Sequence, residues 1–233
     1  MSKLKLSILS GFALIIVLGI INQRHAVACE FVGLSSYSEI APKIFISPTI
    51  SQIRYDEIIA AIAMGRERVN NTFGEMVAFP NIVVAASKSE AASFGSNETG
   101  TAHLTPLGEC IVLGPDGHNA DVAAHEFVHA EVRNRGGWLA NWFEIPTWFN
   151  EGVALLVDHR EPFLTANIQL SQEEIEAVRK LNSGEEFFGG TNVHKNYLAS
   201  RLAVNNVEPL KLYENLILIR NGNSFDSVFN IRN

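Results

Sequence analysis

Apolar positions follow a short, strand-like pattern in the first half of this chain and a helical pattern in the second half. Strands are predicted at 41–48, 81–86 and 109–113, where short apolar runs rich in β-branched residues are bounded by turn residues. The first of these lies between two prolines, which favours a sheet edge. Residues 51–73 repeat apolar positions at helical spacing and stop at Gly74, so they predict a helix. Residues 87–100 are small and polar and predict a loop.

The second half predicts helices almost throughout. Asn119 or Asp121 can cap the first helix, and Gly136-Gly137 ends it. Trp138 and Trp142 are expected to pack the next loop against the core, or else to line a cleft. Further helices are predicted at 146–158, 171–181, 192–204, 209–220 and 224–229. Because no linker interrupts the chain, we expect an α+β fold with a single domain at 29–233, made of an αβ lobe at 29–118 and a helical lobe at 119–233.

The N-terminus has the layout of an export signal. Lys3 and Lys5 precede a 16-residue apolar run at 6–21, and small residues follow at 26–28. Residues 1–28 therefore predict a signal peptide or an N-terminal membrane anchor, since the run is slightly short for a bilayer span. Cleavage after Ala28 would make Cys29 the first residue, where lipid attachment is a further alternative. Either way, we expect an exported protein that is periplasmic or held at the inner membrane facing the periplasm.

Charge and cysteine content narrow the partners and the compartment. A net charge of −7 argues against a nucleic-acid backbone or anionic lipid as the main partner. Cys29 and Cys110 are the two cysteines. An oxidising compartment would allow them to pair, and the alternative is two unrelated thiols. Neither cysteine stands at the spacing of a metal ligand.

His125-Glu126-Phe-Val-His129 carries the chemistry that the sequence predicts. Residues four apart lie on one face of a helix, so both imidazoles can bind one ion. Glu126 points about 100° away around the helix and suits the role of general base on a metal-activated water. The neighbouring positions are apolar on nearly every side, which predicts a buried helix. A metal ion would resolve the cost of burying two histidines and a glutamate there.

Glu151 is the best candidate for a third ligand. It lies 22 residues beyond His129, within Pro146-Thr-Trp-Phe-Asn-Glu-Gly-Val-Ala154. A carboxylate among such apolar neighbours needs a cation or hydrogen-bond donors. The alternative is an ordinary glutamate on a solvated helix face.

His-Glu-Phe-Val-His followed by Trp-Phe-Asn-Glu-Gly resembles the gluzincins, the zinc peptidases that include thermolysin and the aminopeptidase-N group, and most closely the small peptidase MA-like domains. The resemblance covers about 119–229. It implies a zincin-like fold, one Zn²⁺ per chain, His125, His129 and Glu151 as ligands, and Glu126 as the general base. Such families also place a tyrosine on a later helix to stabilise the oxyanion, which implies this role for Tyr197. The alternative for Tyr197 is an ordinary half-buried aromatic. His194, one turn earlier, is expected to be a surface histidine, and the alternative is that it assists the oxyanion.

The chain departs from these families at two places. No Gly-x-Met-Glu-Asn strand stands between Phe94 and Leu113, so the resemblance does not extend to exopeptidase action. Thermolysin-like members carry an aspartate four residues after the ligand glutamate, where this chain has Leu155. Another group must orient the ligand histidines, and Asp158 and Asp226 are the candidates.

The sequence therefore predicts a zinc-dependent peptidase that acts on a peptide or protein substrate. The alternative is a non-catalytic binding or scaffolding module that the zinc stabilises. Three protein ligands with an adjacent glutamate favour catalysis, because structural zinc sites have four protein ligands.

Overall fold

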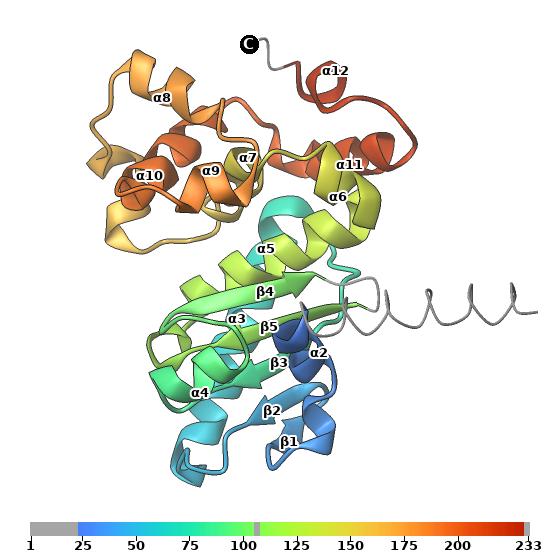
Figure 1. Cartoon of the computed structure of the whole chain (residues 1–233), viewed down its shortest axis with the longest axis vertical. Helices are drawn as coiled ribbons and strands as arrows, with labels where there is room; N and C mark the ends of the chain where they lie inside the picture. The colour runs from blue at the N-terminus through green and yellow to red at the C-terminus, as the bar shows by residue number, and fades with distance from the viewer. Residues whose placement is uncertain (1–22, 105–107, 231–233) are drawn as a thin grey trace, which may run out of the picture.

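The structure, a computed structural model, describes residues 23–104 and 108–230 and has the expected α+β fold, with a five-stranded sheet from the first half of the chain (Figure 1). The strand order is β1-β2-β3-β5-β4. The strands are β1 Ser38–Ala41, β2 Ile44–Ile46, β3 Asn81–Val84, β4 Gly100–Leu104 and β5 Glu109–Leu113. The helices are α2 Arg24–Glu30, α3 Tyr55–Phe73, α4 Lys88–Ser93, α5 Ala120–Gly136, α6 Trp138–Phe143, α7 Thr147–Ala154, α8 Gln172–Val178, α9 Gly184–Phe188, α10 Val193–Ala203, α11 Leu212–Arg220 and α12 Phe225–Phe229.

Three parallel strands form the centre of the sheet, and an antiparallel strand closes each side. β2, β3 and β5 run parallel, whereas β1 pairs antiparallel with β2 and β4 antiparallel with β5. The expected edge position of β2 is therefore wrong, because β1 lies outside it. The expected loop at 87–100 is also wrong, since it contains α4, whose first turn is capped by the Ser87 side chain. β4 begins at the end of that segment and forms the second edge of the sheet.

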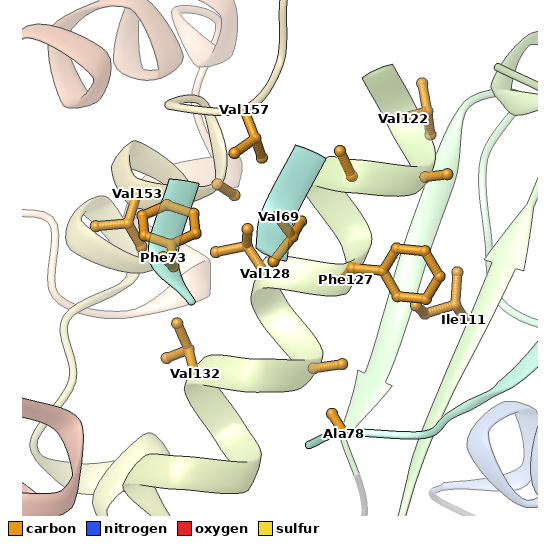
Figure 2. Close-up of a cluster of buried hydrophobic side chains, with 14 of the residues drawn as sticks. Val69, Phe73, Ala78, Ile111, Val122, Phe127, Val128, Val132, Val153 and Val157 are labelled. Atoms are coloured by element: carbon orange, nitrogen blue, oxygen red, sulfur yellow. The ribbon is translucent and has the colours of Figure 1, made fainter. Parts of the chain in front are cut away.

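Two apolar layers cover the two faces of the sheet. On one face α3 and α5 pack together, and Figure 2 shows Val69 and Phe73 of α3 beside Val128 and Val132 of α5. On the other face α2 and η1 (Val32–Leu34) contribute to a smaller cluster that contains a disulfide between Cys29 and Cys110. The cysteines therefore pair, and the sulfur of Cys29 is not free to carry a lipid.

The helices after α5 build the second lobe. α5 lies between the lobes, because it packs on α3 and the sheet and also on α7. α7 is shorter than expected and ends at Ala154. The segment after α5 is a helix rather than the expected loop, and Trp138 and Trp142 on it are 40% and 65% exposed. Their expected packing against the core is therefore wrong, whereas the alternative holds for Trp142, which lines a cavity of about 770 Å³.

The predicted signal or anchor lies largely outside the described residues, which begin at Gln23. The expected cleavage position after Ala28 falls inside α2, where Ala26 is buried against the sheet. Within 23–104 and 108–230, no helix is both long enough and apolar enough to cross a bilayer.

Candidate metal centre

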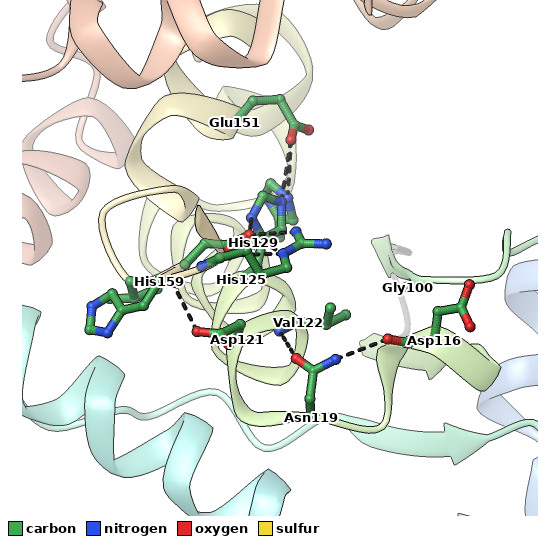
Figure 3. A network of polar contacts seen from close by, with 12 residues as sticks. Gly100, Asp116, Asn119, Asp121, Val122, His125, His129, Glu151 and His159 are labelled. Carbon is green, nitrogen blue, oxygen red and sulfur yellow. Dashed lines mark hydrogen bonds and ion pairs between the residues drawn. The ribbon is translucent and has the colours of Figure 1, made fainter. Parts of the chain in front are cut away.

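The helix α5 holds both histidines because its first turn is firmly capped and its middle is buried. The Asn119 side chain accepts a hydrogen bond from the Val122 N–H and donates one to the Asp116 carbonyl (Figure 3). Every residue from Val122 to Val132 is buried, as the apolar pattern predicted. The helix therefore presents His125, Glu126 and His129 from a fixed backbone.

The three predicted ligands converge. One carboxylate oxygen of Glu151, Oε2, lies 3.4 Å from Nε2 of His125 and 3.6 Å from Nε2 of His129 (Figure 3). Ligand atoms about 2.0–2.1 Å from a tetrahedral ion stand about 3.3 Å apart, which these two distances approach. All three side chains are buried, and together they form a group that could hold a metal ion.

The charges within the group suit a cation. Burial by itself would lower the pKa of His129, but the Glu151 carboxylate outweighs it and raises that pKa to about 9. Burial would raise the pKa of Glu151, but the charge of His129 and the close approach of both imidazoles lower it to about 2. Without a metal ion, a proton on His129 thus compensates the buried carboxylate. Even so, Oε2 of Glu151 has no hydrogen-bond partner among the described residues, so the donor set fits a divalent ion.

Asn150 orients one histidine ligand. Its side-chain oxygen lies 3.1 Å from Nδ1 of His129. An amide oxygen only accepts, so Nδ1 donates, which leaves Nε2 as the nitrogen that can bind a metal ion once His129 is neutral. Sequence reasoning missed this residue, although it directly precedes the ligand glutamate.

Asp158 faces the other histidine. Its buried Oδ2 lies 3.7 Å from Nδ1 of His125, which is longer than a hydrogen bond. Arg160 donates from Nε to the Asp158 carboxylate at 2.9 Å and holds it in place. Asp158 is thus the candidate that the structure brings to the site. Asp226 lines a separate cavity beside Trp142 and is wrong as an orienting group.

Glu126 lies beside the ligands, at the wall of a cleft of about 290 Å³. Burial raises the pKa of its carboxyl group above the ordinary range, and the two histidines only partly offset this effect. The side chain lies against Gly100, the first residue of β4, where an added Cβ would approach Glu126 Oε1 to 2.9 Å. Gly100 is a second residue that sequence reasoning missed.

Tyr197 also lines this cleft, and its ring lies 6.4 Å from that of His125. Burial, with the charges of Glu151 and Glu126, raises its pKa far above the ordinary value, so the hydroxyl stays protonated and able to donate. Gly152 brings Tyr197 close, because a Cβ there would lie 2.6 Å from the Ser200 carbonyl oxygen and would push α10 away from α7. His194 is exposed, as expected, and lines the mouth of the same cleft together with Arg160 and Phe163.

No protein-family model matches this chain, and neither a curated protein nor a solved structure matches it. What can be said about its chemistry therefore comes from its own residues and their geometry.

Proposed function

We propose that this chain is a zinc-dependent peptidase of the gluzincin type, with Glu126 as the general base. The observation that carries the proposal is the convergence of one carboxylate oxygen and two imidazole nitrogens at 3.4 and 3.6 Å, directly beside Glu126. Two nitrogens and one oxygen form a donor set typical of catalytic zinc, and three protein ligands leave one coordination position open. A zinc ion held there would polarise a substrate carbonyl and lower the pKa of a water molecule.

The chain's own residues supply the remaining chemistry. Glu126 takes the proton of the attacking water and returns it to the leaving amine. Its raised pKa brings it closer to neutral pH, where transfer in both directions is efficient. The Tyr197 hydroxyl donates to the oxygen of the carbonyl under attack as negative charge develops there.

The sheet edge offers a place for an extended peptide. β4 is the edge strand on the side of the metal centre, and its first residue, Gly100, contacts Glu126. A peptide that pairs with β4 by strand addition would run past the general base. The substrate we propose is therefore a peptide or an extended protein segment, and the site of action is the periplasm, where the Cys29–Cys110 disulfide would persist.

Replacing Glu126 with Gln tests the proposal directly. The variant should bind one zinc ion per chain, because Glu126 is not in the ligand group, and should lose at least about 100-fold in hydrolysis of a peptide library. Metal analysis and a library screen with and without a chelator are the measurements. Unchanged cleavage by the variant would overturn the mechanism. Zinc binding without cleavage by the wild-type chain would favour the zinc-stabilised binding module instead.

A further inference from the structure

Helix α6 exposes more large apolar surface than any structural need explains. Four of its six residues are large hydrophobics facing solvent: Trp138 at 40%, Leu139 at 60%, Trp142 at 65% and Phe143 at 75% exposure. We call these four residues the α6 face. Single exposed hydrophobics are common, but a contiguous group of this kind marks a contact surface. The ring centroids of Trp138 and Trp142 lie 6.2 Å apart, so the two aromatic side chains form one continuous surface.

The chain before the described residues indicates what covers the α6 face. The apolar run at 6–21 ends only two residues before Gln23, and α2 begins at Arg24. The three peptide units between residue 21, the end of the apolar run, and residue 24, the start of α2, span about 10 Å at most. α2 is fixed to the body by the Cys29–Cys110 disulfide and by a 3.0 Å hydrogen bond between His25 Nδ1 and the Ser93 carbonyl. If the run enters a bilayer, the folded body must lie close against that bilayer.

α2 and α6 lie at the same end of the sheet. Cys29 is bonded to Cys110 in the first half of β5. Arg133, near the end of α5, pairs at 3.2 Å with Glu109, the first residue of β5. α6 begins two residues after α5 ends, so it starts near this end of the sheet, on the face opposite α2 (Figure 1). If residues 6–21 enter a bilayer, the short connection to α2 thus brings the end of the fold that carries the α6 face close to that bilayer.

The composition of the α6 face fits a lipid interface. Tryptophan and phenylalanine favour the boundary between headgroups and acyl chains. The exposed Arg220 lies over Gly137 at the start of α6, with its Nη1 donating to the Asn134 carbonyl, and can meet lipid phosphates. We propose that the α6 face rests in the bilayer surface into which residues 6–21 insert. The part of α5 between His125 and Gly136 is about 17 Å long, and it would separate the metal centre from the α6 face by about that distance.

Tryptophan fluorescence tests this proposal, because the chain has only three tryptophans and none in 1–22. Trp148 is buried at 2% exposure and serves as an internal reference. The intact chain, reconstituted in phosphatidylcholine–phosphatidylglycerol vesicles with brominated acyl chains, should lose roughly half of its emission relative to unbrominated vesicles, since two of three tryptophans would contact lipid. The double variant Trp138→Phe and Trp142→Phe retains the apolar face and should show almost no quenching.

A second pair of variants tests whether the apolar contact causes the effect. Leu139→Glu together with Phe143→Glu should reduce the quenching several-fold. Ile53→Glu, at a residue that is 92% exposed at the opposite end of the sheet, should not change it. Unquenched wild-type emission would overturn the proposal. Blue-shifted but unquenched emission would also overturn it, by showing that protein, such as a second copy, covers the face. So would an intact mass showing loss of residues 1–28.

Discussion

Asn150 and Asp158 orient the two histidine ligands in different ways. Asn150 accepts from Nδ1 of His129 at 3.1 Å, whereas Asp158 approaches Nδ1 of His125 only to 3.7 Å and is held by Arg160. The first contact fixes a tautomer, and the second supplies a buried negative charge. In the proposed metal centre, the two residues would therefore contribute to metal binding without contacting the ion.

Asn150→Ala should weaken zinc binding about 10- to 100-fold, because His129 loses the acceptor that fixes its ring. Asn150→Asp keeps an oxygen acceptor at the same place and should stay close to the wild-type affinity. Competition with a chromophoric chelator measures both constants. Equal affinities for the alanine variant and the wild type would show that the hydrogen bond does not orient the ligand.

Gly100→Ala should slow hydrolysis while leaving the metal bound. The new Cβ would come 2.9 Å from both Glu126 Oε1 and Val122 Cγ1, so the carboxylate must move. A small displacement of a general base costs about tenfold or more in rate, whereas zinc affinity should change by less than about twofold. Steady-state kinetics with metal analysis checks this. Gly190→Ala is the control, since its Cβ would meet nothing closer than 4.0 Å. A wild-type rate in Gly100→Ala would remove the positioning role.

At the scale of elements, the sequence predicts well what local signals determine. β5 has the predicted bounds, and α5 starts at its Asn119 cap and ends at the Gly136-Gly137 break. β4 was missed because Gly-Thr-Ala-His-Leu has little strand character of its own and is held by antiparallel pairing with β5. α6 was missed because its hydrophobic residues face outward, against the usual rule of burial.

The same distinction applies within the metal centre. The pairing of His125 with His129 follows from helix geometry and was readable in the sequence. The contacts of Asn150 with His129 and of Gly100 with Glu126 join separate elements. No local pattern encodes them, because they depend on how α7 and β4 pack against α5.

Removing the disulfide should destabilise the fold without disturbing the metal centre. Cys29 and Cys110 close a loop with a sequence separation of 81, for which chain entropy gives about 4.5 kcal/mol. The bond lies in the cluster on the sheet face away from α5. Urea unfolding of Cys29→Ser with Cys110→Ser should show this loss, with zinc stoichiometry unchanged. A loss below about 1 kcal/mol would mean that α2 is held by its packing alone.

Over the whole molecule, the proposed metal centre joins α5 to the helical lobe. α5 packs on the sheet and contributes His125 and His129, whereas Glu151 comes from α7 and Tyr197 from α10. A metal ion held by His125, His129 and Glu151 connects these elements. It stabilises the folded chain more strongly the higher its affinity is. Anything that changes that affinity therefore changes the stability of the entire fold.

Metal binding should release a proton from the folded protein. In the metal-free chain the pKa of His129 is raised to about 9, so at pH 7 this imidazole is protonated, whereas Glu151, with its pKa lowered to about 2, is already ionised. A ligand histidine must be neutral, so zinc displaces that proton. Zinc affinity should then rise about tenfold per pH unit from pH 7 toward 9 and level off above, because only below its pKa does His129 carry a proton to lose. Calorimetric titrations in buffers of different ionisation enthalpy would count the released proton. The difference between the unfolding midpoints with and without zinc should grow over the same pH range, because the metal-free fold loses the stabilisation given by protonated His129 as the pH rises toward 9. An affinity independent of pH between 7 and 9 would show that His129 is neutral before the metal arrives, and the buried Glu151 carboxylate would then need another compensating charge.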